Sequence, residues 1–315
     1  MNGYQVVRIH VDAGLALVRR HATDATLWVT WPRHAESSAA DDAAVLLQAA
    51  TSRPSPSLAL RPADFVPRLA FEIVPSADGH DPQNLVVFLH GRGDSHVPFG
   101  RLAAQMGLPQ TAGIALRAPL ELPFDLGHTW LHDLDDDFNV IPPHVSHARR
   151  SQSLQEARKT LWHFLEILRD IYNWPLDRIF LFGFSQGACM AFDLVMTRSC
   201  RLGGVVLIAG GAIQGPHLSR DGYSEPSEHE TPVLLISGSR DDQYPPSMVH
   251  LSEQHFTHKY KKRLWTRHTM PKRHEMIASR DEMQHVMMFF SEHLYLRNIA
   301  LEERSDLIEI TPQRR

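Results

Sequence analysis

The stretch that decides the fold runs from residue 178 to residue 191 and reads Arg-Ile-Phe-Leu-Phe-Gly-Phe-Ser-Gln-Gly-Ala-Cys-Met-Ala. Its first part, Arg178–Phe182, is short and apolar, which is typical of a buried strand. Gln186–Thr197 is expected to be a helix, so Gly-x-Ser-x-Gly lies in a sharp turn between strand and helix. Such a turn exposes the hydroxyl of Ser185, and the helix N-terminus favours negative charge there. Ser185 is therefore the candidate nucleophile; the alternative is a serine that only caps the helix.

Outward from this turn, short apolar segments alternate with amphipathic helices from about residue 69 onward. The expected strands are Phe71–Val74, Leu85–Leu89, Gly113–Arg117, Arg178–Phe182, Gly204–Ile208, Val233–Ser237 and Arg263–Thr266. The expected helices are Ser151–Tyr172, Gln186–Thr197, Ser247–His258 and Ala278–Arg297. Such alternation indicates an α/β protein with a mostly parallel, doubly wound sheet. Together with the serine turn, it predicts an α/β-hydrolase fold, whose functional residues follow the carboxyl ends of the strands.

The first 65 residues have a different pattern. Short strands that form a β-meander are expected at Tyr4–Val11, Leu15–Val18 and Thr26–Trp31. An Ala-rich stretch at 35–50 is expected to be helical, and a Pro/Ser-rich run follows it. We therefore expect a short β-rich N-terminal appendage with a Pro/Ala-rich linker (1–65), a catalytic domain (66–300) and a polar C-terminal tail (301–315). The appendage is the expected place for contacts with other proteins.

Composition excludes several classes of function. The chain has 315 residues, of which 43% are hydrophobic and 22% charged, and its net charge is −4 with histidine neutral. This charge gives no reason to expect nucleic-acid binding. No apolar run approaches the length of a membrane span, and the N-terminus lacks a signal-peptide pattern, so we expect no integral membrane association and a cytoplasmic location. Cys189 and Cys200 do not indicate a disulfide framework.

The acid of a catalytic triad should follow a strand downstream of Ser185, because this fold orders its triad Ser, Asp or Glu, His. The strand Val233–Ser237 leads into Gly238-Ser239-Arg240-Asp241-Asp242. Asp241 lies three residues past the glycine, where the chain should turn back over the strand end, and is the preferred candidate. Asp242 is the alternative, although it could equally cap the next helix.

The base should follow one further strand. His268 and His274 both come after Arg263–Thr266, and His274 lies just ahead of the last expected helix. That position favours His274, because His268 is too close to the strand end. Glu275 beside His274 suggests a zinc-protease motif, but residue 278 is alanine, so the second histidine of His-Glu-x-x-His is absent. We expect neither a metal nor a cofactor.

An oxyanion site needs two backbone N–H groups, one after the nucleophile and one from an earlier loop. Gln186 is the first candidate. The second is Arg92, in the Gly-bracketed turn His90-Gly91-Arg92-Gly93 after the strand Leu85–Leu89. An ordinary glycine-rich turn is the alternative for this loop.

These motifs together resemble the phospholipase/carboxylesterase family, which includes acyl-protein thioesterases and bacterial carboxylesterases. The resemblance covers roughly residues 69–296 and is carried by Leu89–Asp94, Gly183–Ala188, and Gly238–Asp241 with Pro245. It implies a triad of Ser185, Asp241 and His274, oxyanion donors at Arg92 and Gln186, and a substrate-binding Trp130 beside the acyl groove. Ala209-Gly210-Gly211 and the polar segment 214–231 depart from the family pattern, so substrate choice is expected to differ.

The residues and the resemblance predict a serine hydrolase that cleaves a carboxylic ester or acyl thioester through an acyl-enzyme. Its partner would be a small-molecule or acylated substrate. One alternative is a hydrolase of the same fold that cleaves another bond, as in a peptidase or lactone hydrolase. The other is a non-catalytic binding protein, which would be expected to have lost one member of the triad.

Overall fold

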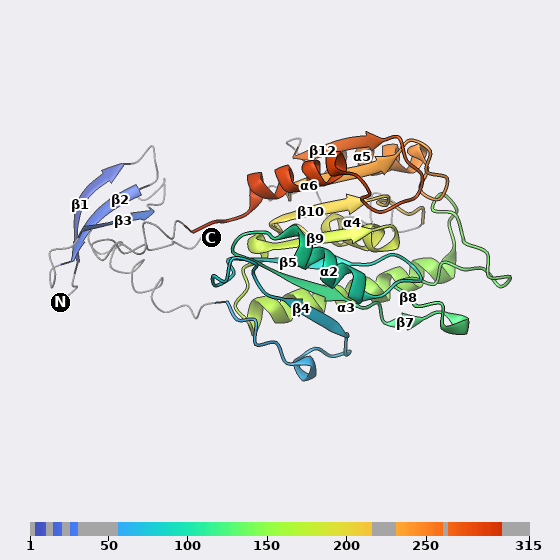
Figure 1. The fold of residues 1–315 in the computed structure, drawn as a ribbon, viewed down its shortest axis with the longest axis horizontal. Helices are drawn as coiled ribbons and strands as arrows, with labels where there is room; N and C mark the ends of the chain where they lie inside the picture. Colours follow the sequence, from blue (N-terminus) through green and yellow to red (C-terminus); the bar gives the residue numbers. More distant parts are fainter. Residues whose placement is uncertain are drawn as a thin grey trace. The chain divides into compact units, whose positions relative to one another are not determined.

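The computed structural model describes residues 56–215, 231–260 and 264–297, together with the backbone of three N-terminal strands (Figure 1). The chain divides into two compact units, one formed by Met1–Ser55 with Arg297–Arg315 and the other by Pro56–Leu296. In the first unit, strands β1 (Tyr4–His10), β2 (Leu15–Arg20) and β3 (Thr26–Thr30) form the expected antiparallel meander. The expected helix at 35–50 lies outside the described residues.

The larger unit is built on a seven-stranded sheet with the order β12-β11-β10-β9-β5-β6-β4. Its strands are β4 Phe71–Val74, β5 Asn84–Leu89, β6 Thr111–Leu116, β9 Ile179–Phe184, β10 Gly204–Ile208, β11 Val233–Gly238 and β12 Trp265–Met270. Every neighbouring pair is parallel except β4 and β6, which are antiparallel. The predicted α/β-hydrolase fold with a mostly parallel sheet is therefore confirmed.

Helices cover both faces of this sheet (Figure 1). They are α2 His96–Met106, α3 Ala148–Asp170, α4 Gln186–Thr197, α5 Pro246–Lys259 and α6 Arg280–His293. Side chains of a strand alternate between its faces. Accordingly, Leu85 and Val87 of β5 belong to the apolar core that contains α3, α4 and α5, whereas Val86 and Phe88 belong to the core under α2 and α6.

The centre of the sheet is a topological switch point. Strand β5 is followed in the chain by α2 and then by β6 on one side, whereas β9 is followed by α4 and then by β10 on the other side. In open α/β sheets, ligands bind outside the carboxyl ends of the strands at such a point. The loop after β5 and the turn after β9 meet there, so this edge is the place to look for a site.

Residues 56–65 belong to the larger unit, which moves the expected boundary at residue 65 back to residue 55. Phe65 is 1% exposed, and its ring stacks on Phe164 of α3 with centroids 4.6 Å apart. The indole N–H of Trp174 donates to the carbonyl of Ser57 at 2.9 Å. The prolines of this stretch suggested a linker, but its apolar side chains pack against α3.

Two further differences affect the neighbourhood of the site. The sequence pattern did not predict α2 or the small hairpin of β7 (Leu120–Glu121) and β8 (His128–Thr129). Helix α3 begins at Ala148, three residues before the expected start at Ser151, which places Arg150 in its first turn.

Candidate active site

Ser185 lies in a strained turn between β9 and α4. Its backbone φ is 53°, a left-handed value that side chains rarely adopt, and its N–H donates to the carbonyl of Ile208 at 2.8 Å. A Cβ atom on Gly187 would lie 2.1 Å from the Leu89 carbonyl oxygen, and one on Gly183 would lie 2.5 Å from the carbonyl oxygen of Gly187. Only glycine fits at these two positions, which explains the Gly-x-Ser-x-Gly pattern in steric terms.

Three candidate residues form a continuous chain of hydrogen bonds. His274 Nε2 lies 2.7 Å from Ser185 Oγ, and its Nδ1 lies 2.9 Å from Asp241 Oδ2. The side chain of Asp241 is fully buried, and that of His274 is 11% exposed. The residues follow β9, β11 and β12, so their order in the chain is Ser, Asp, His. A nucleophile, a base and an orienting acid would need such an arrangement.

Asp242 and His268, the alternatives for the acid and the base, do not take part in this chain of hydrogen bonds. Asp242 is exposed. His268 lies within β12, because that strand continues to Met270, and its ring stacks on His285 with centroids 3.6 Å apart. Of the two acids and two histidines considered, the structure brings only Asp241 and His274 together with Ser185.

The carboxylate of Asp241 is held in one orientation by the chain that follows it. Its Oδ1 accepts the backbone N–H groups of Gln243 at 3.0 Å and of Tyr244 at 2.8 Å. Its Oδ2 faces His274 Nδ1. His274 Nδ1 also lies 3.1 Å from Oδ1, so the imidazole faces both carboxylate oxygens, with Oδ2 the nearer, while the backbone amides hold Oδ1.

The expected oxyanion donors, Arg92 and Gln186, both line the cavity at Ser185. Gln186 opens α4, and the first amides of a helix have no acceptor within it. The loop of Arg92 is fixed on both sides: Arg92 Nη1 donates to Asp133 Oδ2 at 2.7 Å, and the Gly93 amide donates to the His128 carbonyl at 2.8 Å. Both residues thus lie in well-anchored segments of chain at the cavity that contains Ser185.

His90 holds the same loop from within. Its Nε2 accepts the amide of Ala118 at 2.9 Å, so its Nδ1 carries the hydrogen and donates to the carbonyl of Gly91 at 2.7 Å. Burial lowers the pKa of His90, which keeps the ring neutral and this tautomer in place. In the sequence, His90 is recognisable only as part of the turn, because its positioning role depends on contacts with Gly91 and Ala118.

Trp130 does not reach the cavity, in contrast to the expectation that it binds substrate. Its side chain is 1% exposed, and its indole N–H donates to the carbonyl of His90 at 2.9 Å. Its own amide donates to Gln186 Oε1 at 2.6 Å. The residue is thus anchored between the loop after β5 and the start of α4, since its ring nitrogen binds His90 and its amide binds Gln186.

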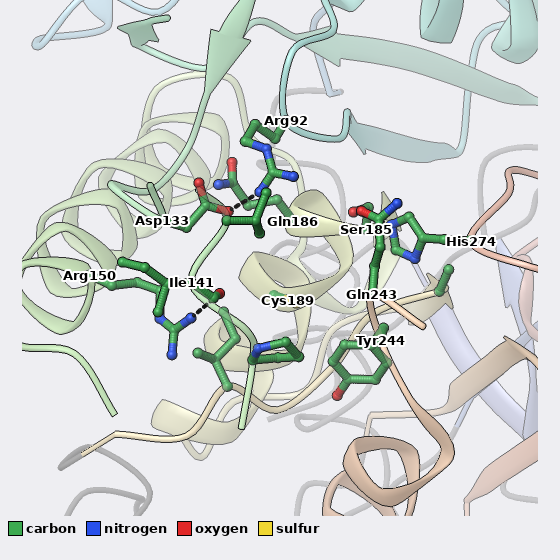
Figure 2. Close-up of a pocket in the computed structure, with 14 residues that line it drawn as sticks. Arg92, Asp133, Ile141, Arg150, Ser185, Gln186, Cys189, Gln243, Tyr244 and His274 are labelled. Atoms are coloured by element: carbon green, nitrogen blue, oxygen red, sulfur yellow. Dashed lines mark hydrogen bonds and ion pairs between the residues drawn. The ribbon is translucent and has the colours of Figure 1, made fainter. Parts of the chain in front are cut away.

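The cavity at Ser185 has a volume of about 60 Å³. Figure 2 shows Ser185 and His274 on one side and Arg150 on the other. Between them lie Cys189 and apolar residues that include Ile141. Arg150 and Cys189 were not predicted as site residues, since each occurs in a pattern that is typical of an ordinary helix.

Cys189 should be unreactive in the folded protein although it lines the cavity. Burial raises the pKa of its thiol to about 12, so the nucleophilic thiolate is nearly absent at neutral pH. Iodoacetamide at pH 7.5 should leave Cys189 unmodified in the native protein, as peptide mapping would show. The same treatment in guanidinium chloride should alkylate both cysteines. Rapid native alkylation of Cys189 would contradict this expectation.

Within the described ranges, no cluster of three or more His, Cys, Asp or Glu side chains is arranged to hold a metal ion. None of the helices found there combines the length and apolar character needed to cross a bilayer.

The fold and the residues at its strand ends define the class of protein as an α/β-hydrolase. Residues 70–298 match the family described as phospholipase/carboxylesterase, and the chain belongs to this family of hydrolases. The resemblance noted in the sequence is thereby confirmed.

Individual relatives agree with this assignment. An uncharacterized hydrolase of Schizosaccharomyces pombe is 34% identical over 132 residues, which are 40% of this chain and 53% of the relative. An uncharacterized hydrolase of Mycosarcoma maydis is 32% identical over 169 residues, which are 51% of this chain and 58% of the relative. The chain thus spans little more than half the length of these relatives. The crystal structure of esterase PE8 has the same fold, with a TM-score of 0.58 and 22% identity over 72% of this chain and 99% of that one.

Proposed function

We propose that the protein is a serine hydrolase that cleaves a carboxylic ester or an acyl thioester through an acyl-enzyme on Ser185. The observation that carries this proposal is the hydrogen-bonded chain from Ser185 through His274 to Asp241, with 2.7 Å between Oγ and Nε2. A serine hydroxyl is a weak nucleophile unless a neighbouring base takes its proton. Membership of a hydrolase family supports the same reaction class.

Acylation would begin when Ser185 Oγ attacks the carbonyl carbon of the substrate. The hydroxyl proton passes to His274 Nε2, and the carbonyl electrons move to the oxygen. The backbone amides of Arg92 and Gln186 would hold this oxyanion, and Asp241 would stabilise the imidazolium. When the tetrahedral intermediate collapses, the bond to the leaving group breaks and His274 returns the proton to the departing alcohol or thiol.

Deacylation would repeat these steps with water as the nucleophile. His274 takes a proton from the water while the oxygen of the water attacks the acyl carbon. The same two amides hold the second oxyanion. Collapse then breaks the bond to Ser185 Oγ, which regains its proton from His274. The products are the carboxylic acid and the free enzyme.

Reaction with a fluorophosphonate probe tests this proposal. The probe should label the native protein, and peptide mapping should place the label on Ser185, because only an activated serine displaces the fluoride rapidly. Protein unfolded in guanidinium chloride beforehand is the control and should remain unlabelled. The proposal is wrong if the native protein hydrolyses p-nitrophenyl esters while the label is absent from Ser185 or lies on another serine.

A further inference from the structure

Arg150 is a buried cation in the wall of the candidate active site. Its residue exposure is 2%, and it lines the same cavity as Ser185 and His274. It lies in the first turn of the 23-residue helix α3, where the helix dipole disfavours positive charge and favours negative charge. A buried arginine at this position needs a compensating partner.

The contacts of Arg150 solvate its guanidinium without neutralising it. Nη1 donates to the carbonyl oxygens of Ile141 at 2.8 Å and Pro142 at 3.0 Å. Nη2 donates to the carbonyls of Val145 and, at 3.4 Å, of Gln214. Nε is buried and has no hydrogen-bond partner. Within the described ranges no carboxylate forms an ion pair with it, and burying a charge without a counter-ion is costly.

The same helix shows what a paired buried arginine looks like. Arg158 directs its Nε and Nη2 at the two oxygens of Asp193, at 2.5 and 2.7 Å. This edge of the guanidinium is a planar fork that binds a carboxylate through two parallel hydrogen bonds. In Arg150 the corresponding edge consists of Nε and Nη2. Nε has no hydrogen-bond partner, and the bond from Nη2 to Gln214 is the longest of the four hydrogen bonds that the guanidinium forms.

The charge of the cavity wall favours an anion. Its lining contains two arginines and one aspartate, and that aspartate, Asp133, is already paired with Arg92 at 2.7 Å. Among these lining side chains, the positive charge of Arg150 is therefore the one left over when His274 is neutral. The negative charge of Asp241 lies outside the lining, where its carboxylate faces His274 Nδ1 at 2.9 Å. Burial lowers the pKa of Arg150, in line with the cost of holding this charge away from water.

The position of Arg150 indicates which part of a substrate would carry the anion. The leaving group must lie beside His274, because His274 Nε2 returns a proton to it. Figure 2 shows His274 and Arg150 at opposite sides of the cavity, with Cys189 between them. An acyl group bound to Ser185 and directed away from His274 would therefore extend toward Arg150.

We propose that Arg150 binds a carboxylate at the far end of the acyl group, so that the preferred substrates are half-esters or half-thioesters of dicarboxylic acids. This inference rests on the proposed ester hydrolysis for its kinetic consequence. The carboxylate would bind the guanidinium of Arg150, and the carbon chain would lie along Cys189 and Ile141. Arg150 then determines specificity, while Ser185 and His274 perform the reaction.

Two substrates that differ only in charge test the proposal. They are mono-p-nitrophenyl glutarate and its neutral methyl ester, and kcat/KM is measured for both. The wild-type protein should prefer the charged substrate, and Arg150→Gln should lower kcat/KM for it on the order of 10- to 100-fold, the range for a hydrogen bond to a charged group. The neutral ester should change little. Arg149→Gln is the matched control, because it removes the same charge from an exposed neighbour in the same helix turn.

The outcomes distinguish a binding role from a structural one. If Arg150→Gln lowers kcat/KM equally for both esters, or if the wild-type protein shows no preference, the proposal is overturned. If Arg150→Gln does not fold, as circular dichroism would show, Arg150→Lys replaces it. Lysine keeps the charge but lacks the planar fork, so the ratio of the two kcat/KM values should still fall.

Direct binding of glutarate separates this proposal from the proposed function. Calorimetry should detect glutarate binding to the wild-type and Arg149→Gln proteins and a loss of at least tenfold in affinity for Arg150→Gln. Failure of the wild-type protein to bind millimolar glutarate overturns the anion site, even if esters are hydrolysed. Arg150-dependent binding without ester hydrolysis or Ser185 labelling would leave the anion site standing and reject the serine hydrolase.

Discussion

Replacement of Ser185 by alanine should lower kcat for p-nitrophenyl acetate and butyrate by a factor on the order of 10³ or more, which is typical of removing a catalytic nucleophile. The change deletes Oγ, the atom 2.7 Å from His274 Nε2, so no acyl-enzyme can form. The amides of Arg92 and Gln186 remain in the variant. They should support at most a slow hydrolysis by bound water.

The fold should survive this substitution. Within the described residues, the Ser185 side chain forms a hydrogen bond with His274, and alanine is close to serine in size. Thermal unfolding of Ser185→Ala should therefore stay close to the wild-type curve. Ser239→Ala is a suitable control, because Ser239 is exposed and follows the neighbouring strand β11. Full esterase activity in Ser185→Ala would reject the assignment of the nucleophile.

The second large effect is expected for Asp241→Asn, which should lower kcat by about 10⁴ with little change in shape. The backbone amides of Gln243 and Tyr244 both donate to Oδ1, so they would bind the amide oxygen of the new asparagine. Its NH₂ group would then face His274 Nδ1. A donor at that position forces the hydrogen of His274 onto Nε2, where the base can no longer accept a proton from Ser185.

Asp242→Asn gives a control for this experiment. This substitution removes the same charge one residue away. Because the side chain of Asp242 is exposed, kcat should stay within about twofold of wild type, as for most surface changes. Steady-state kinetics of the two variants, with circular dichroism to check folding, makes the comparison. If the Asp241→Asn protein keeps more than a tenth of the wild-type kcat, the assignment of Asp241 as the acid that orients His274 is wrong.

Much of the hydrolase unit could be predicted from sequence, because its signals are local. Gly204–Ile208 is a continuous apolar run, and the predicted strand matches β10 in full. Gln186–Thr197 follows a tight turn, and the predicted helix matches α4. The residues Asp241 and His274 could be chosen because the fold places functional side chains directly after its strands. Their catalytic roles stay predictions.

Other features depend on contacts between distant parts of the chain. Helix α2 was missed because Pro98 and Gly100 interrupt its pattern near the start. Trp130 was placed in the groove by resemblance, whereas its indole binds the carbonyl of His90, 40 residues earlier. In the sequence Arg150 resembles any helical arginine. Only the folded structure shows that carbonyl groups of residues 141–145 and 214 surround its guanidinium. Local pattern carries no information on such pairings.

The close approach of Gly187 to Leu89 has a consequence for redesign. With only 2.1 Å between a would-be Cβ and the Leu89 carbonyl oxygen, the first turn of α4 can lie this close to the end of β5 only if residue 187 is glycine. The serine turn and the end of β5 are therefore in direct backbone contact. The wall that carries Val140, Ile141 and Pro143 belongs to a separate stretch of chain. Libraries confined to that wall would change the cavity lining while leaving the serine turn intact, whereas substitutions at residue 187 should prevent the protein from folding.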